Sequence, residues 1–219
     1  MKIIEYDTER YCFSSLITDL YGVPLEVLDS EDKKTNLSLG KDTHTSLHKV
    51  FYERLDSKEG WPEFEDLYRL FVSEALFPLF SEEATSLVYQ SVPGIRFNRP
   101  GAKAVYSWHS DGDKNHKHPL GEINIYLPLT DSYDTNTIWV ESIPGLGDFH
   151  PVNLEYGQFL MGYLNQCRHG NKINKTGKTR VSLDFRIIPD FAYDETYEAT
   201  TCTTKKLFKV GNYYSKMER

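Results

Sequence analysis

The hydrophobic pattern of the chain changes near residue 85, and this change restricts the folds that it can adopt. Before it, apolar residues recur at helical spacing, which predicts helices over 11–21, 43–55 and 62–79. After it, short alternating or β-branched runs broken by Gly, Pro, Asn and Asp predict strands near 86–91, 95–98, 103–109, 122–129, 137–141, 157–161 and 179–188. Helices followed by many short strands predict a β-sandwich or barrel with helices packed outside.

The length and composition fit one domain with a buried core. The chain has 219 residues, of which 39% are hydrophobic and 14% aromatic, and such values are typical of a globular protein. We therefore expect a single domain over residues 1–219. It would consist of a helical support region (1–85), a strand-rich core (86–190) and a polar, tyrosine-rich C-terminal tail (191–219).

Charge and cysteine usage narrow the classes of partner. The net charge is -7 and no basic run is present, which argues against a nucleic-acid or membrane partner. Three widely spaced cysteines (Cys12, Cys167 and Cys202) form neither a disulfide framework nor a C-x-x-C zinc motif. No signal peptide is evident, and no apolar stretch approaches the length of a bilayer span. We expect a cytoplasmic protein with a small-molecule substrate, and homo-oligomerisation stays open.

Two short stretches carry residues that suit a metal. The first contains His109 and Asp111, which are two apart and would face the same way on an extended strand. The second contains His169. Two imidazoles and one carboxylate are the ligand set of a mononuclear non-haem Fe(II) centre, which keeps adjacent positions open for other ligands. Each stretch alone is a weak signal, because H-x-D occurs by chance and a lone histidine is more commonly structural.

The segment 179–188 alternates strictly between polar and apolar residues. Arg180, Ser182, Asp184 and Arg186 share one face, which is either exposed to solvent or lines a polar cavity. A guanidinium with a hydroxyl two residues further on can hold a carboxylate by charge-assisted hydrogen bonds. Because His169 lies eleven residues before Arg180, the cavity is the favoured interpretation.

Other histidines offer alternative metal sites. His116 and His118 follow Asp111 closely, but the glycine, asparagine and His-Pro pair around them are typical of a loop. His44 and His48 are spaced as neighbours on one helix face, where two histidines can chelate a metal. A pair on a helix surface is the favoured interpretation, because no third ligand lies nearby in the sequence.

The same stretches carry a family resemblance. The segment 169–182 (HGNKINKTGKTRVS) resembles the distal-histidine region of 2-oxoglutarate/Fe(II) oxygenases, including phytanoyl-CoA-hydroxylase-like members. The blocks WHSDGDKNHKHPLGEINIYLPLT and DTNTIWVES look like oxygenase-like proteins of the streptomycin-biosynthesis type, whose relatives occur in sporadic carbohydrate gene clusters. The resemblance covers roughly residues 94–190, with the motifs in the expected order.

The resemblance implies a fold and an iron site. The implied fold is mainly β with a helical N-terminal part: a double-stranded β-helix, the cupin-like jelly roll, which would occupy residues 86–190. His109, Asp111 and His169 would be the iron ligands. The implied cofactor is Fe(II), with 2-oxoglutarate as co-substrate and O₂ as oxidant.

The resemblance also implies residues that bind the co-substrate. Arg180 and Ser182 would bind the distal carboxylate of 2-oxoglutarate. Asn124 and Tyr126 share one face of the predicted strand 122–129, and we favour Asn124 as a contact to 2-oxoglutarate or substrate. Tyr106, three residues before His109, is a weaker candidate.

The implied function is that of a 2-oxoglutarate-dependent dioxygenase. It would hydroxylate a small polar metabolite, such as a carbohydrate or secondary-metabolite intermediate, with release of succinate and CO₂. The alternatives are a non-catalytic jelly-roll module that binds metal and carboxylate, and a zinc hydrolase or isomerase, in which the Arg-x-Ser pair would be idle. The sequence leaves open the substrate, the position oxidised, desaturation in place of hydroxylation, and the roles of His116, His118, Arg96 and Arg186.

Overall fold

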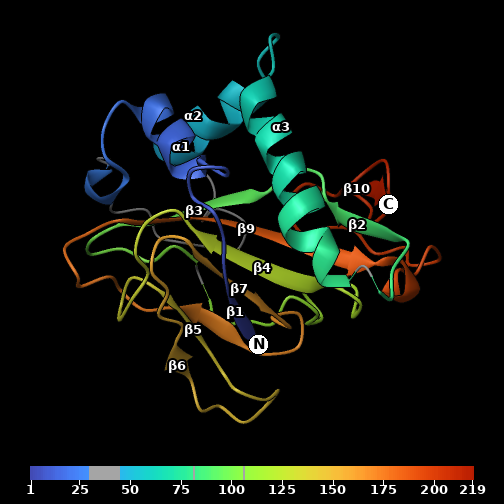
Figure 1. Ribbon diagram of the computed structural model, residues 1–219. Helices are drawn as coiled ribbons and strands as arrows, with labels where there is room; N and C mark the ends of the chain where they lie inside the picture. The colour runs from blue at the N-terminus through green and yellow to red at the C-terminus, as the bar shows by residue number, and fades with distance from the viewer. Residues whose placement is uncertain (30–44, 81, 106) are drawn as a thin grey trace.

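A computed structural model of the protein describes residues 1–29, 45–80, 82–105 and 107–219, which form two antiparallel sheets beneath a group of helices (Figure 1). The main sheet runs in the order β1-β7-β4-β9-β2-β10, and β3 pairs with β9 outside this path. Its strands are β1 (Lys2–Glu5), β2 (Ser86–Gln90), β3 (Gly94–Asn98), β4 (Ile123–Pro128), β7 (Gln158–Gly162), β9 (Arg180–Pro189) and β10 (Tyr214–Glu218). The smaller sheet runs in the order β6 (His150–Pro151), β5 (Ile138–Val140) and β8 (His169–Asn171).

The helices cover one face of the main sheet (Figure 1). They are α1 (Phe13–Tyr21), α2 (Ser46–Leu55) and α3 (Pro62–Phe71), with short turns η1 (Leu25–Val27), η3 (Val72–Leu76) and η4 (Phe77–Phe80). A proline opens α3 and glutamates lie in its first turn, which suits a helix N-terminus. Phe71 at its end packs edge-on against Phe159 of β7, with ring centroids 5.6 Å apart. This contact belongs to the largest apolar core, between helices and sheet.

The other face of the main sheet looks toward the smaller sheet. Tyr126 of β4 and Leu160 of β7 pack there with Ile138 and Val140 of β5 in a second buried cluster. The alternation of β9 explains the two environments, because successive side chains of a strand point to opposite faces. Its apolar residues join the core under the helices, and its polar residues face the space between the sheets. The two sheets form an open jelly roll.

The C-terminal segment is part of this architecture. The region 191–219, expected to be a tail over the domain, ends in β10, which pairs with β2 along the main sheet. Phe208 and Tyr214 are buried against Val88 and Ile188. The Tyr214 hydroxyl donates a hydrogen bond to the carboxylate of Glu122, which is fully buried just before β4. The segment therefore closes one end of the sheet with a core of its own.

Most predicted elements are confirmed, with shifted ends. The three predicted helices correspond to α1, α2 and α3, although residues 43 and 44 lie outside the described residues and α3 gives way to η3 and η4. The predicted strand 103–109 is wrong. Its described residues pair only at His109, through an isolated bridge to His169. The strands β1, β6, β8 and β10 were not predicted.

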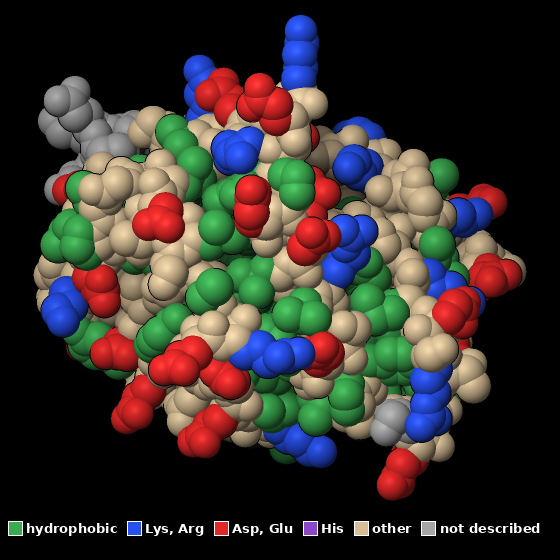
Figure 2. Space-filling model, turned by 45° about the horizontal axis from the view of Figure 1, so that its top comes forward, with side chains coloured by type: hydrophobic (Ala, Val, Ile, Leu, Met, Phe, Trp, Pro, Cys, Tyr) green, Lys and Arg blue, Asp and Glu red, His purple; other side chains and the backbone are tan. Residues whose placement is uncertain are grey.

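Charged side chains of opposite sign are mixed on the surface. On the face shown in Figure 2, basic and acidic side chains are interspersed among apolar ones. Within the described residues, no helix combines the length and the apolar character needed to cross a membrane.

Candidate metal centre

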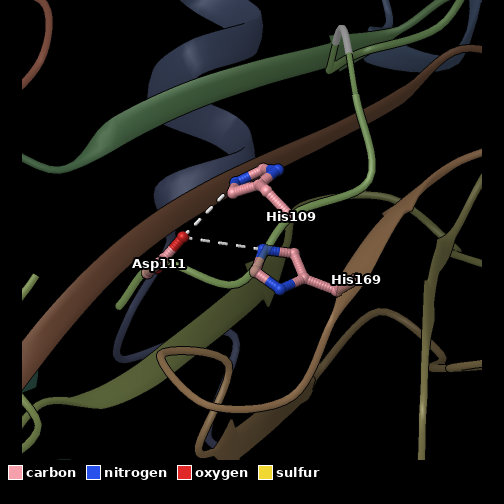
Figure 3. A group of neighbouring side chains, drawn as sticks. All are labelled: His109, Asp111 and His169. Carbon is pink, nitrogen blue, oxygen red and sulfur yellow. Dashed lines mark ion pairs between the residues drawn. The ribbon is translucent and has the colours of Figure 1, made fainter. Parts of the chain in front are cut away.

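His109, Asp111 and His169, the three predicted metal ligands, lie together between the two sheets. One ligand atom from each lies within 4.8 Å of the others. Oδ1 of Asp111 is 3.4 Å from Nε2 of His109 and 3.7 Å from Nε2 of His169. The two rings and the carboxylate point toward one another in Figure 3. The structure thus brings together residues that are up to sixty positions apart in the sequence.

The two histidines are fixed by a backbone bridge. The amide of His109 donates to the carbonyl of His169 at 3.0 Å, and the amide of His169 donates back at 2.8 Å. This bridge adds one residue pair to the edge of the smaller sheet. The two imidazoles therefore stand side by side, with centroids 4.6 Å apart, as directly opposed residues of an antiparallel pair do.

Asp111 reaches the site from a turn, not from the strand that its spacing suggested. Its amide donates to the carbonyl of Leu164, and the amide of Gly112 donates to that of Asn165 at 2.8 Å. A Cβ at position 112 would lie only 2.6 Å from the Asn165 carbonyl oxygen. The glycine of H-S-D-G therefore lets this turn lie tightly on the segment after β7, and the turn aims the carboxylate at the histidines.

The histidine tautomers suit metal binding. Nδ1 of His109 donates to the carbonyl of Ser107 at 2.9 Å, and Nδ1 of His169 donates to that of Cys167 at 3.1 Å. A backbone acceptor holds the Nδ1 proton of each ring, so Nε2 is the nitrogen that faces the shared carboxylate and is left to ligate a metal. Backbone acceptors of this kind orient the histidine ligands of metal sites.

The second oxygen of Asp111 is held by two side chains of the main sheet. Oδ2 accepts hydrogen bonds from Nδ2 of Asn124 on β4 at 2.7 Å and from Nη2 of Arg186 on β9 at 2.6 Å. Burial raises the pKa of Asp111, but the Arg186 guanidinium and the His109 hydrogen bond outweigh it and hold the pKa well below its usual range. Asp111 is therefore an ionised carboxylate with Oδ1 directed at the imidazoles.

Burial and the carboxylate act oppositely on the histidines. Burial lowers the pKa of His169 to about 4, and the attraction of Asp111 offsets this only in part. Burial also lowers the pKa of His109, but its closer contact with Asp111 outweighs this and raises the pKa above its ordinary value. One neutral imidazole, a second imidazole paired with a carboxylate, and the carboxylate itself fit a divalent first-row metal ion.

Arg180 of the predicted carboxylate clamp lines the same cavity as the triad, whereas Ser182 is not among the residues that line it. Arg180 is fully buried, with Nε donating to the carbonyl of Asn136 at 3.0 Å and Nη1 donating to Oγ of Ser182 at 2.8 Å. The hydroxyl of Ser182 in turn donates to Oδ1 of Asp184 at 2.8 Å. Two of the five donors of the guanidinium are thereby engaged, and the arginine is rigidly placed inside the cavity.

The remaining predicted residues have differing outcomes. Asn124 lines the cavity, but it also donates to Asp111 and accepts from the amide of Asn165, so it holds the ligand as well as facing the space. Tyr106 lies outside the described residues. Contacts of either residue with 2-oxoglutarate or substrate stay a prediction.

The histidines after Asp111 hold carboxylates of their own loop. His116 donates to Asp113 at 2.9 Å, and its ring stacks on His109 with centroids 4.3 Å apart. His118 donates to the buried Glu122 at 2.8 Å. Neither belongs to the three-ligand group, and His44, the partner proposed for His48, lies outside the described residues.

Arg186 is the functional residue whose place the sequence did not reveal. The alternation of β9 places it on the polar face, and the sequence left its role open between a pair with Asp184 and a contact to a polar substrate. The structure pairs it with Asp111 instead, and Asp184 contacts Ser182 and Arg96. The signal was the position of Arg186 opposite Asn124 in the ladder, but a single sequence does not give the register.

Comparisons with known proteins bear on the relatives and the fold of the chain. No protein-family model matches the chain. The streptomycin biosynthesis protein StrG of Streptomyces griseus is 29% identical over 212 residues, which are 96% of each chain. The non-haem monooxygenase ThoJ has a similar fold, with a TM-score of 0.51 for its nickel complex and 0.52 without ligand. In both cases 13% of residues are identical, over 91% of this chain and 78% of that one. The jelly-roll fold is confirmed by its likeness to this monooxygenase, and the predicted resemblance to proteins of the streptomycin-biosynthesis type is confirmed by the StrG match.

Proposed function

We propose that the protein is an Fe(II)- and 2-oxoglutarate-dependent dioxygenase that hydroxylates a small polar metabolite, with release of succinate and CO₂. One observation carries the proposal. The three-ligand group of His109, Asp111 and His169 opens into the same cavity as the buried guanidinium of Arg180. A metal site alone needs no such arginine, whereas a co-substrate with two carboxylates uses both ends of this cavity. Residues 1–219 would act as one domain.

The chain's own residues have separate tasks in this proposal. His109, Asp111 and His169 would hold the iron, which when bound supplies the site for O₂ activation. Arg180 would bind the distal carboxylate of 2-oxoglutarate, because it lines the cavity and its charge is buried. Arg186 and Asn124 would keep Oδ1 of Asp111 directed at the metal. The apolar residues of the lining, such as Ile138 and Leu164, would exclude water.

An anaerobic titration tests the proposal. Protein loaded with Fe(II) is titrated with 2-oxoglutarate, and the weak visible charge-transfer band is recorded for wild type and Arg180→Ala. We expect the band in both proteins, with the variant needing at least about tenfold more 2-oxoglutarate, because a charge-assisted hydrogen-bond pair is lost. At moderate co-substrate concentrations, succinate formation with O₂ should follow in wild type but not in Arg180→Ala.

A matched variant makes the result specific. Arg168 is an exposed arginine beside His169 that does not line the cavity, so Arg168→Gln should titrate like wild type. If iron binds but no band forms at any 2-oxoglutarate concentration, the triad serves the non-catalytic binding module or a zinc enzyme. Succinate formation that persists in Asp111→Ala would also contradict the iron assignment.

A further inference from the structure

Arg96 on β3 brings an unsatisfied cationic group into the cavity of the metal centre. Its Nε and Nη1 are buried, and among the described residues neither donates a hydrogen bond to an acceptor. Nε lies 3.5 Å from Oδ2 of Asp184, which is a long ion pair without hydrogen-bond geometry. Buried polar groups are almost always hydrogen-bonded, and a buried charge without such bonds is costly. A group of this kind in a cavity indicates a ligand that supplies the acceptors.

Asn171 on β8 presents the opposite kind of group. Its Oδ1 is buried and accepts no hydrogen bond from the described residues, although the side chain lines the same cavity. Its Nδ2 donates to the carbonyl of Thr137 at 3.0 Å, and this bond fixes which end of the amide faces which way. Asn171 lies two residues after His169 on the same strand, so the two side chains share a face. The cavity therefore also offers an unused acceptor.

The co-substrate of the proposed function does not satisfy both groups. At neutral pH 2-oxoglutarate carries two carboxylates and a ketone, all of which are acceptors, so it cannot donate to Asn171. Its distal carboxylate is already assigned to Arg180. Three arginines and two aspartates line the cavity (Arg96, Arg180, Arg186, Asp111 and Asp184), so the wall has a surplus of positive charge. A second ligand with a negative charge and a hydrogen-bond donor fits what remains.

We infer that the substrate, the molecule to be hydroxylated, is a small anion that itself bears at least one hydroxyl or ammonium group. Arg96 binds its carboxylate or phosphate, and Asn171 accepts a hydrogen bond from its donor group. This inference rests on the proposed function, because it assigns the groups of the cavity that iron and 2-oxoglutarate leave unused. Arg96 then determines specificity: neutral molecules of the same size leave its buried donors unpaired and are rejected.

Matched pairs of probes test the inference. Calorimetry on anaerobic Fe(II)-loaded protein with 2-oxoglutarate compares D-gluconate with sorbitol, D-glucuronate with D-glucose, and D-glucose 6-phosphate with D-glucose. At least one anion should bind more tightly than its neutral partner. Arg96→Gln should lower the affinity of the protein for that anion by about tenfold or more. Arg96→Lys should retain part of the wild-type affinity for the anion. The control variant, Arg168→Gln, should bind the anion as tightly as wild type does.

A second arm isolates Asn171. Asn171→Leu should lower the affinity for the anion that carries hydroxyl groups. The affinity for hexanoate, which lacks hydroxyl groups, should be the same as in wild type. Thermal unfolding of each variant verifies that it is folded. Equal binding of anions and neutral partners, or anion binding that ignores Arg96, would overturn the inference.

The 2-oxoglutarate titration separates this inference from the proposed function. Arg96→Gln should need the same 2-oxoglutarate concentration as wild type, unlike Arg180→Ala. If it needs as much as Arg180→Ala does, Arg96 serves the co-substrate and the inference fails while the dioxygenase stands. If wild type shows no 2-oxoglutarate band but still binds the anions through Arg96, the dioxygenase fails and the anion site remains.

Discussion

Asp111 is the residue on which the charges of the site converge. One of its oxygens faces two imidazoles, and the other accepts hydrogen bonds from Asn124 and Arg186. Only 2% of the residue is exposed, so its charge is not stabilised by bulk water. Because the arginine and the amide hold Oδ2, the direction of Oδ1 is set by the main sheet and does not depend on a metal.

Replacing Arg186 tests this positioning role. Arg186→Met should lower the affinity for Co(II), followed by its visible spectrum, by about 10- to 100-fold, as loss of a partner that orients a metal ligand typically does. Without metal, the variant should unfold at lower urea concentration. The free energy of unfolding should fall by about 3 to 5 kcal/mol, because a buried carboxylate is left without its cationic partner.

The control for Arg186 uses the partner itself. In an Asp111→Asn background, Arg186→Met should reduce the free energy of unfolding much less, since no charge remains to be compensated. Equal losses in the two backgrounds, or an unchanged Co(II) affinity in the single variant, would show that Arg186 does not act through Asp111.

At the scale of elements, the turn after His109 has little room to move. Gly112→Ala should displace this turn, because the added Cβ would meet the Asn165 carbonyl at 2.6 Å. We expect Co(II) affinity to fall by at least about tenfold, since Asp111 is adjacent and metal ligation tolerates little misplacement. Ser110→Ala in the same segment is the control. A Gly112→Ala protein that binds Co(II) like wild type would contradict the tight packing.

The link between β2 and η5 (Asp190–Ala192) gives an acid-dependent prediction. Asp190 accepts hydrogen bonds from the amides of Thr85 and Ser86, both at 3.0 Å, and from the Thr85 hydroxyl. The Thr85 hydroxyl, followed by these amides, lowers the pKa of Asp190. A lowered folded-state pKa contributes stability above the unfolded value near 3.8, and this contribution is lost as the pH falls through the folded value.

Asp190→Asn should therefore be less stable than wild type at neutral pH and should lose less stability on acidification. Urea unfolding between about pH 6 and pH 3 measures both effects. Glu195→Gln, which alters an exposed carboxylate in the same segment, should follow wild type throughout. Parallel pH curves for wild type and Asp190→Asn would refute the role of the hydrogen bonds.

The elements that the sequence predicts well are those with a clear period. The alternation of 179–188 fixed both faces of β9 in advance, and the spacing of Phe64, Leu67 and Phe71 predicted α3. The site was less accessible, because its convergence depends on long-range pairing. The bridge between His109 and His169 joins residues 60 positions apart, and the register that places Arg186 beside Asn124 joins residues 62 positions apart. Local patterns do not encode such pairings. The resemblance supplied the two histidines as partners, but it did not supply the place of Arg186.

At the scale of the whole molecule, the centre lies where the two sheets meet. His109 and His169 belong to the edge of the smaller sheet, whereas Asp111 is tied to β4 and β9 of the main sheet. A bound ion would therefore join the two halves of the jelly roll. An ion that binds only the folded state stabilises it by an amount that rises with the logarithm of the free ion concentration once this exceeds Kd.

Metal loading should raise the temperature of unfolding. At a free metal concentration of one hundred times Kd, the free energy of unfolding increases by about 2.7 kcal/mol. For a chain of this size this corresponds to a shift of roughly 5 to 10 °C. Calorimetry of Co(II)-loaded protein against chelator-treated protein measures it, and Asp111→Ala should show no shift. An equal shift in that variant would mean that the metal binds elsewhere.

The backbone bridge between the two histidines has a consequence for metal supply. Because hydrogen bonds hold both rings before any ion arrives, the site does not need to rearrange in order to bind. At a site of two imidazoles and one carboxylate, relative affinities should follow the general order in which nickel, copper and zinc exceed iron. Loading with the iron of the proposed function would depend on which ions are offered, and protein purified in air over a nickel resin should carry nickel.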